Sequence, residues 1–119
     1  MRCRIDRGMV DGTLVLRMFV HDAPHRRMLV HREVLRDYRK HLIAAARRAG
    51  LVVPITEPIE LKVTFVDPTS PDLGNLYLAL ENAMDGAIVL DDSLIQAQAT
   101  NKMYVATEER APVKLKIVA

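Results

Sequence analysis

With 119 residues, half of them apolar, the chain can form one domain with a modest core, which we expect to span residues 1–119. Its lone cysteine, Cys3, excludes an internal disulfide, and we find no secretory signal and no apolar run of membrane-spanning length. We therefore expect a soluble, cytoplasmic protein without a membrane partner. The net charge of +2 conceals a division, because residues 1–50 contain twelve Arg or Lys against five Asp or Glu, whereas residues 51–119 contain five against ten.

The amino-terminal residues predict a β-hairpin. Short strands are expected at Arg2–Asp6 and Thr13–Val20, and Asp11-Gly12 between them is a typical two-residue hairpin turn. The next segment, His21–Arg27, is polar and contains a proline, so we expect a loop there.

The clearest predicted helix, Arg32–Ala49, has an apolar face and a basic face, and it ends before Gly50. The apolar face consists of Val34, Leu35, Tyr38, Leu42, Ala45, Ala46 and Ala49. The basic face has no acid and consists of Arg32, Arg36, Arg39, Lys40 and Arg47. Eleven of the twelve cations before residue 51 are Arg, which can make two-point contacts with phosphate. We interpret this face, with Arg26 and Arg27 in the preceding loop, as a DNA-binding surface; the alternative is an ordinary solvated face.

Strict alternation over Ile59–Val66 predicts a strand, with the inward side chains Ile59, Leu61, Val63 and Phe65. After a loop containing two prolines, Ser70 is expected to cap a helix that begins at Pro71 and ends near Met84. Its core face would consist of Leu73, Leu76, Leu80 and Ala83 or Met84, and Asp85-Gly86 would end it.

Two final strands are expected at Ile95–Val105 and Val113–Val118, joined by a polar turn around Thr107–Arg110. The predicted order is β-β-α-β-α-β-β, in which strands come in pairs instead of alternating regularly with helices. This order favours an α+β fold, a single small domain with a mixed β-sheet and two helices packed on one face.

The candidate active site consists of three aspartates around the second helix. Asp72 lies at the start of the helix, and Asp91 and Asp92 close the apolar run that follows it. If the chain folds back beside the helix, the three carboxylates meet, and their repulsion calls for a divalent cation such as Mg²⁺. Each acid also has a structural alternative, because acids are favourable in the first turn of a helix and aspartate pairs are common in turns.

Two further observations concern ligands. Asn75 lies one helical turn after Asp72 and is either a neutral metal ligand or a solvent-facing side chain. The chain contains neither a Walker loop nor a dinucleotide fingerprint, so no nucleotide cofactor is expected.

Three segments resemble the RusA family of Holliday junction resolvases, which are small dimeric enzymes often carried by phages and prophages. They are Pro71-Asp72-Leu73-Gly74-Asn75-Leu76, Val89-Leu90-Asp91-Asp92-Ser93-Leu94-Ile95 and Asn101-Lys102-Met103. The likeness in order and spacing covers roughly Ile59 to Val118.

The resemblance implies a RusA-like fold and a homodimer that resolves four-way DNA junctions in recombination and repair, in a bacterial or phage-infected cell. It implies an endonuclease that uses Mg²⁺, which Mn²⁺ could replace. By the family pattern, Asp72 and Asp92 would be the main metal ligands, Asp91 would support them, and Lys102 would be the catalytic lysine.

The chain departs from the family pattern at two positions. Gly74 replaces the second aspartate at the helix start, and Leu78 replaces a functional lysine four residues later. Either the metal site is rebuilt with Asn75, Asp67 or Glu60, or the protein binds junctions with little or no cleavage. A third alternative is an interaction module in which the acids only cap turns.

Overall fold

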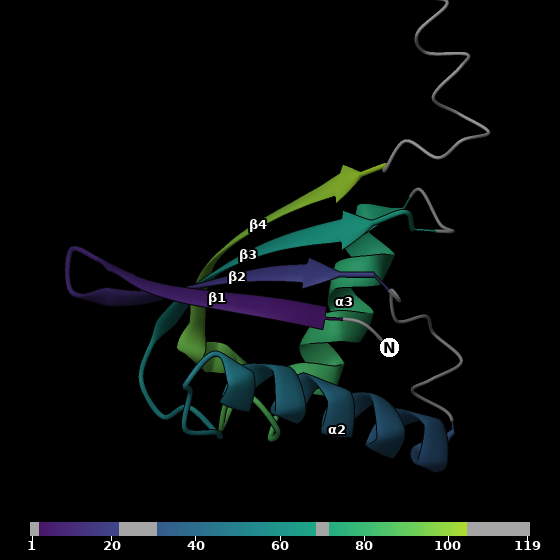
Figure 1. The fold of residues 1–119 in the computed structure, drawn as a ribbon, viewed down its shortest axis with the longest axis horizontal. Helices are drawn as coiled ribbons and strands as arrows, with labels where there is room; N and C mark the ends of the chain where they lie inside the picture. The colour runs from purple at the N-terminus through teal and green to yellow at the C-terminus, as the bar shows by residue number, and fades with distance from the viewer. Residues whose placement is uncertain (1–2, 22–30, 69–71, 105–119) are drawn as a thin grey trace, which may run out of the picture.

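The computed structural model describes residues 3–21, 31–68 and 72–104, which form a mixed sheet covered by two helices (Figure 1). The strands are β1 (Cys3–Val10), β2 (Thr13–Val20), β3 (Ile59–Val66) and β4 (Ile95–Met103), in the spatial order β1-β2-β3-β4. The first two strands pair antiparallel, whereas β2, β3 and β4 run parallel to one another. The predicted α+β class with a mixed sheet and two helices is confirmed.

Both helices lie on one face of the sheet because each one connects two parallel strands. Helix α2 (Arg32–Arg48) connects β2 to β3, and α3 (Leu73–Met84) connects β3 to β4. Crossovers of this kind are right-handed, and both advance across the sheet in the same direction, so both helices fall on the same side (Figure 1). Within the described ranges, neither helix is long and apolar enough to span a membrane.

The core lies between the helices and the inward side chains of the strands. All four inward residues predicted for β3 are at most 2% exposed. Tyr38 and Leu42 of α2, with Leu76 and Leu80 of α3, pack against them as predicted. Val34 was placed on the apolar face by its spacing, but it is 47% exposed because the first turn of α2 extends past the amino-terminal start of β1 (Figure 1).

Several element boundaries differ from the predicted ones. Strand β1 continues to Val10 instead of ending at Asp6, because every residue up to Val10 has a partner in β2. Asp11 and Gly12 form the predicted turn, with φ of 51° and 79°. Helix α3 begins at Leu73 with Asp72 as its N-cap, so the predicted start at Pro71 is wrong.

The remaining predictions concern the end of the last described strand and the residues that the structure does not describe. Strand β4 ends at Met103, before the predicted limit. The residues Arg26, Arg27, Ser70, Pro71 and Val105, together with the predicted strand Val113–Val118, lie outside the described residues.

Candidate metal centre

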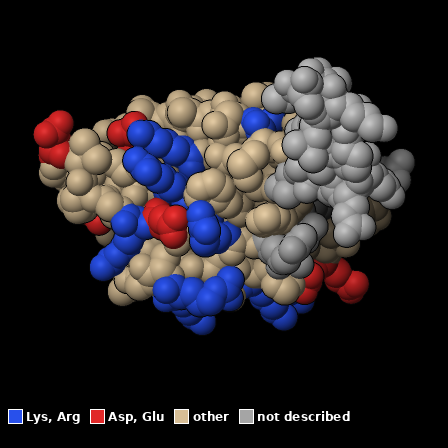
Figure 2. Space-filling model, turned by 45° about the horizontal axis from the view of Figure 1, so that its top comes forward, with Lys and Arg blue, Asp and Glu red and all other residues tan. Residues whose placement is uncertain are grey.

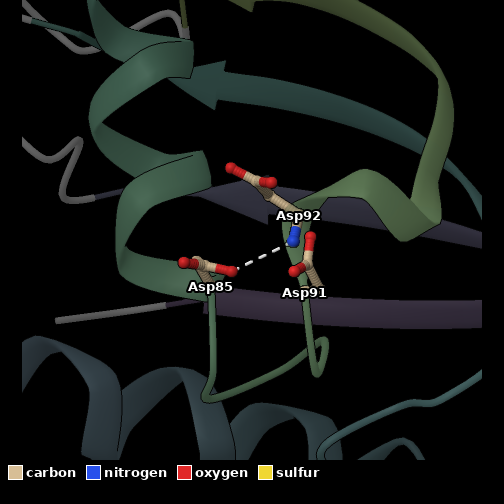
Figure 3. A group of neighbouring side chains, drawn as sticks. All are labelled: Asp85, Asp91 and Asp92. Carbon is tan, nitrogen blue, oxygen red and sulfur yellow. Dashed lines mark hydrogen bonds between the residues drawn. The ribbon is translucent and has the colours of Figure 1, made fainter.

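Three aspartates meet where α3 ends and the chain turns back toward the sheet (Figure 3). Asp85 is the C-cap residue of α3. Asp91 caps the short 3-10 helix η1 (Asp92–Leu94), and Asp92 is its first residue. One carboxylate oxygen from each of the three lies within 4.8 Å of the others, and all three side chains are exposed.

The turn after α3 brings these acids together through its backbone hydrogen bonds. The N–H groups of Ala87 and Ile88 donate to the carbonyl of Met84 at 3.0 and 2.8 Å. Gly86 adopts φ of 78°, which permits the chain reversal, and its N–H donates to the carbonyl of Val89 at 2.8 Å. Ile88 and Val89 are fully buried and hold the turn against the core. The reversal returns the chain to the carboxyl end of α3.

Two side chains of the cluster are fixed by neighbouring N–H groups. Asp85 Oδ1 accepts a hydrogen bond from the backbone N–H of Asp92 at 3.0 Å (Figure 3). Asp91 Oδ1 accepts one from the backbone N–H of Ser93 at 2.8 Å. Each carboxylate has two oxygens with about four lone-pair sites, so both retain acceptor capacity toward a cation.

The electrostatics of the cluster favour a positive charge among its members. Partial desolvation, and then the charges of Asp85 and Asp91, raise the pKa of Asp92. Burial, and then the charges of Asp92 and Asp85, also raise the pKa of Glu81, one turn before the end of α3. Hydrogen bonds from Ser93 lower the pKa of Asp91 and keep it ionised. A cation would relieve the repulsion that raises the first two pKa values.

The donor set fits a divalent cation of the magnesium type. Carboxylate oxygens are the ligands that Mg²⁺ and Mn²⁺ prefer. Mg²⁺ usually keeps several water ligands and binds through one or two carboxylates, which suits an exposed group of three.

Asp72 does not join this cluster, so the prediction that it meets Asp91 and Asp92 within one chain is wrong. It lies at the opposite end of α3 from Asp85, and the twelve residues between them span on the order of 18 Å. Its two carboxylate oxygens accept from the backbone N–H and the side-chain amide of Asn75, at 3.1 and 2.7 Å. Within the described residues, Asp72 therefore has the structural role of an N-cap.

Lys102 also lies away from the cluster. It pairs with Phe65 at the carboxyl end of the parallel strands, whereas Asp92 precedes the start of β4. The seven steps of extended strand from Ile95 to Lys102 span on the order of 23 Å. The structure thus divides the predicted catalytic residues between the two ends of the sheet.

Of the residues considered as replacements for the acid missing at Gly74, neither Asp67 nor Glu60 belongs to the group of acids that meet, whereas Asp85, which was not considered, does. Asn75 is bonded to Asp72, and Asp67 follows the carboxyl end of β3. Asp85 was missed because Asp-Gly after a helix is typical of a helix end. The available signal was its position six residues before an aspartate pair, with a glycine that lets the chain reverse.

The predicted basic face of α2 forms a shallow groove of about 490 Å³. Its lining residues are Arg32, Leu35, Arg36, Arg39, Lys40 and Ile43, with no acid among them. The sheet face is different, because basic and acidic side chains are mixed there (Figure 2). Asp6 lies opposite Arg17 in the register of β1 and β2, and its Oδ2 lies 3.5 Å from Nε of Arg4. The groove on α2 is therefore the better candidate for a polyanion.

Arg39 connects this groove to the acidic cluster. Its Nε donates to the carbonyl of Ala83 and its Nη2 to the carbonyl of Asn82, both at 3.1 Å. These are carbonyls of the last turn of α3, which have no partner within a helix. Arg39 is therefore partly committed to holding the end of α3, and the groove lies beside the helix end that carries Asp85.

Comparisons with known proteins add no relative. No protein-family model matches the chain, and neither the curated proteins nor the solved structures compared with it give a match. The resemblance to the RusA family stays a prediction that depends on the sequence motif.

Proposed function

We propose that the protein is a divalent-metal-dependent endonuclease that acts on branched DNA, with four-way junctions as its preferred substrate. The observation that carries the proposal is the position of three clustered carboxylates beside a groove lined by four cations. Nucleases that use metal ions need both features, because the phosphate must be bound and its charge offset. The choice of branched DNA depends on the motif resemblance.

In this proposal, each group of residues has a separate task. Asp85, Asp91 and Asp92 hold Mg²⁺ or Mn²⁺. When bound, such an ion lowers the pKa of a coordinated water and stabilises negative charge on phosphate. Arg32, Arg36 and Lys40 bind the phosphates on either side of the cleaved one, and Arg39 keeps the end of α3 in place. A symmetric pair of chains would present two such sites to two strands of a junction.

The first experiment measures cleavage of a labelled four-way junction with Mg²⁺ or Mn²⁺. Asp92→Asn and Asp85→Asn should each reduce cleavage at least about 100-fold while junction binding is retained. Asp72→Asn is the matched control, because Asn is also a good N-cap and the position lies outside the cluster. Loss of cleavage in Asp72→Asn together with retention in Asp85→Asn would contradict the assignment.

The second experiment measures metal binding without DNA. The chain has three Tyr and no Trp, so terbium emission excited through protein must come from tyrosine. Tyr77 is buried on α3, one turn before Glu81. Burial, and then the charges of Glu81 and Asp92, raise its pKa to about 12.

Terbium bound at the cluster should therefore emit through Tyr77, and Mn²⁺ should displace it. Tyr77→Phe should remove most of the emission, whereas Tyr38→Phe should not. If a double variant with Asp85→Asn and Asp92→Asn shows unchanged terbium emission, the metal is bound elsewhere.

A second candidate function is junction binding without cleavage. Gly74 and Leu78, together with the separation of Asp72 from Asp92, favour it. Tight, salt-sensitive binding with no cleavage in either metal would support this alternative. Cleavage that arises only in Gly74→Asp would show that the active site needs an acid at the start of α3.

A further inference from the structure

The edge strand β1 runs above α2 in the view of Figure 1, and a cavity of about 390 Å³ lies between them. The cavity is separate from the groove on α2 and from the aspartate cluster, because it shares no lining residue with either. Its apolar wall consists of Cys3, Ile5, Ala45 and Ala49. The short side chains of the two alanines leave room there for a small ligand.

Two arginines border the cavity from opposite sides. Arg7 Nη1 donates to the carbonyl of Gly50 at 3.2 Å, and Arg48 Nη2 donates to the carbonyl of Cys3 at 3.5 Å. Arg7 comes from β1 and Arg48 from the last turn of α2, so the two bonds cross the gap in opposite directions. A guanidinium has five N–H groups, so both arginines keep donors for a ligand.

The end of α2 does not need these two arginines as caps. The carbonyls of Ala45, Ala46 and Arg47 already accept from backbone N–H groups at 2.9 to 3.1 Å, and Gly50 ends the helix with φ of 80°. A cation is favourable near the carboxyl end of a helix, but Arg47 already supplies one in the last turn. Helix capping therefore does not account for two further arginines at the cavity.

The free edge of β1 adds backbone donors. The carbonyl of Cys3 accepts from Arg48, so this carbonyl points away from β2. In an antiparallel pair, residues whose backbone groups face the partner strand alternate with residues whose groups face outward. Ile5 and Arg7, two and four residues after Cys3, therefore direct their N–H groups outward as well, on the side of the cavity that they line.

The one acid of the lining, Asp6, has a partner of its own. Neighbouring residues of a strand point to opposite faces, so Asp6 and Arg4 lie on the sheet face away from the helices. Asp6 Oδ2 lies 3.5 Å from Arg4 Nε, and the guanidinium carbon of Arg4 lies 4.4 Å from the centroid of the Phe19 ring. Three arginines and one aspartate line the cavity, which gives it a net charge of +2.

We propose that this β1–α2 cavity binds a phosphate monoester, the terminal phosphate of a nucleotide or of a nucleic-acid strand. Arg7 and Arg48 can each make a two-point contact with its oxygens, and two backbone N–H groups add further donors. A monoester carries a charge of about −1.5 to −2 at neutral pH, which matches the charge of the cavity. The phosphodiester of an uninterrupted strand carries only one negative charge, and the apolar wall accommodates the group attached to the phosphate.

The test is an NMR titration of the full chain with thymidine 5′-monophosphate in a buffer without divalent metal. The backbone amide signals of Ile5 and Arg7 should shift saturably, with a dissociation constant below about 1 mM. A dinucleoside phosphodiester should bind at least about tenfold more weakly, because it offers less charge and one free oxygen fewer. Thymidine without phosphate should leave both signals in place.

Substitutions locate the ligand. Arg7→Gln and Arg48→Gln should each raise the dissociation constant at least about tenfold, because each removes charge-assisted hydrogen bonds. Arg48→Lys keeps the charge but loses the two-point contact, so its affinity should lie between those of Arg48→Gln and the wild type. Circular dichroism checks folding, and the two Gln variants lie on different elements, so a folding defect in one leaves the other as the test.

Arg47→Gln is the matched control. It removes the same charge from the neighbouring position of α2, outside the lining of the cavity. Because salt screens an exposed charge at a distance, the dissociation constant should change by less than about twofold at physiological ionic strength.

Two DNA duplexes distinguish the sources of the phosphate. One carries a 5′-phosphate and the other does not, so the difference in their affinities reports the terminal phosphate alone. A difference larger than the affinity of the mononucleotide explains, and lost in Arg48→Gln, identifies a strand end as the ligand. Equal binding of the two duplexes, with the mononucleotide still bound, identifies a free nucleotide.

Three results overturn the proposal: no saturable shift at Ile5 and Arg7, equal affinities for the monoester and the phosphodiester, or equal effects of Arg47→Gln and Arg48→Gln. The inference does not depend on the proposed nuclease activity. None of the titrations involves cleavage or metal binding, so a failure here is separate from a failure of the proposed nuclease.

Discussion

Asp72 closes the amino-terminal end of α3 with both oxygens of its carboxylate. An N-cap of this kind contributes about 1 kcal/mol, because it satisfies a backbone N–H that has no partner within the helix. We expect Asp72→Ala to lower the free energy of unfolding by about that amount, and Asp72→Asn to lower it by much less. Urea denaturation measures both variants. Equal losses in the two would contradict a capping role.

Cys3 is buried at the start of β1, and burial raises the pKa of its thiol from 9.0 to about 11. The thiolate is the reactive form, so the folded protein should react with a disulfide reagent at neutral pH far more slowly than the urea-unfolded chain.

The raised pKa of Cys3 also predicts that the protein loses stability as the pH rises. The folded thiol holds its proton more tightly than the unfolded one, so its contribution is complete below pH 9 and is lost toward pH 11. The measurement is the difference in unfolding free energy between wild type and Cys3→Ala across this window, where the wild type should lose more. A difference independent of pH would contradict it.

Helices α2 and α3 are joined at their crossing by Arg39, whose two hydrogen bonds stabilise the end of α3. Removing them in Arg39→Ala should cost about 2 kcal/mol of unfolding free energy. It should also weaken terbium binding, because Asp85 caps that same helix end. Arg36→Ala is the control, since Arg36 is exposed along the groove and its loss should change stability by less than about 0.5 kcal/mol.

The elements that sequence reasoning located best are those with a strict period. The bounds of β2 and β3 match the prediction, and the end of α2 differs by one residue. Periodicity did not predict a strand where only pairing with a neighbouring strand determines the structure. Residues Arg7–Val10 do not alternate clearly, and their partners in β2 make them a strand. Ser70 and Asp72 are both good N-caps by type, so composition alone could not select the start of α3.

At the scale of the whole molecule, the basic half of the sequence, residues 1–50, supplies the groove on α2. Two cations of its strands, in contrast, lie next to an acid in the sheet. If the groove binds phosphates, the affinity for junction DNA should fall steeply with salt. Each contact contributes about 0.9 to the slope of log K against log salt concentration. Arg36→Gln combined with Lys40→Gln should therefore reduce the slope by about 2, as measured by binding titrations at several salt concentrations. Arg17→Gln, on the sheet face, should leave the slope unchanged.

The sequence by itself determined the fold class, the hairpin turn, the alternating strand β3 and the two faces of α2. These depend on local periodicity and on turn residues, which a single chain displays directly. Only the tertiary structure decided which acids meet. Helix α3 separates Asp72 from Asp85 by its full length, and the turn at Gly86 returns the chain to the carboxyl end of that helix. Spacing along the sequence does not specify the direction of such a return, so Asp85 joins Asp91 and Asp92 in the place expected for Asp72.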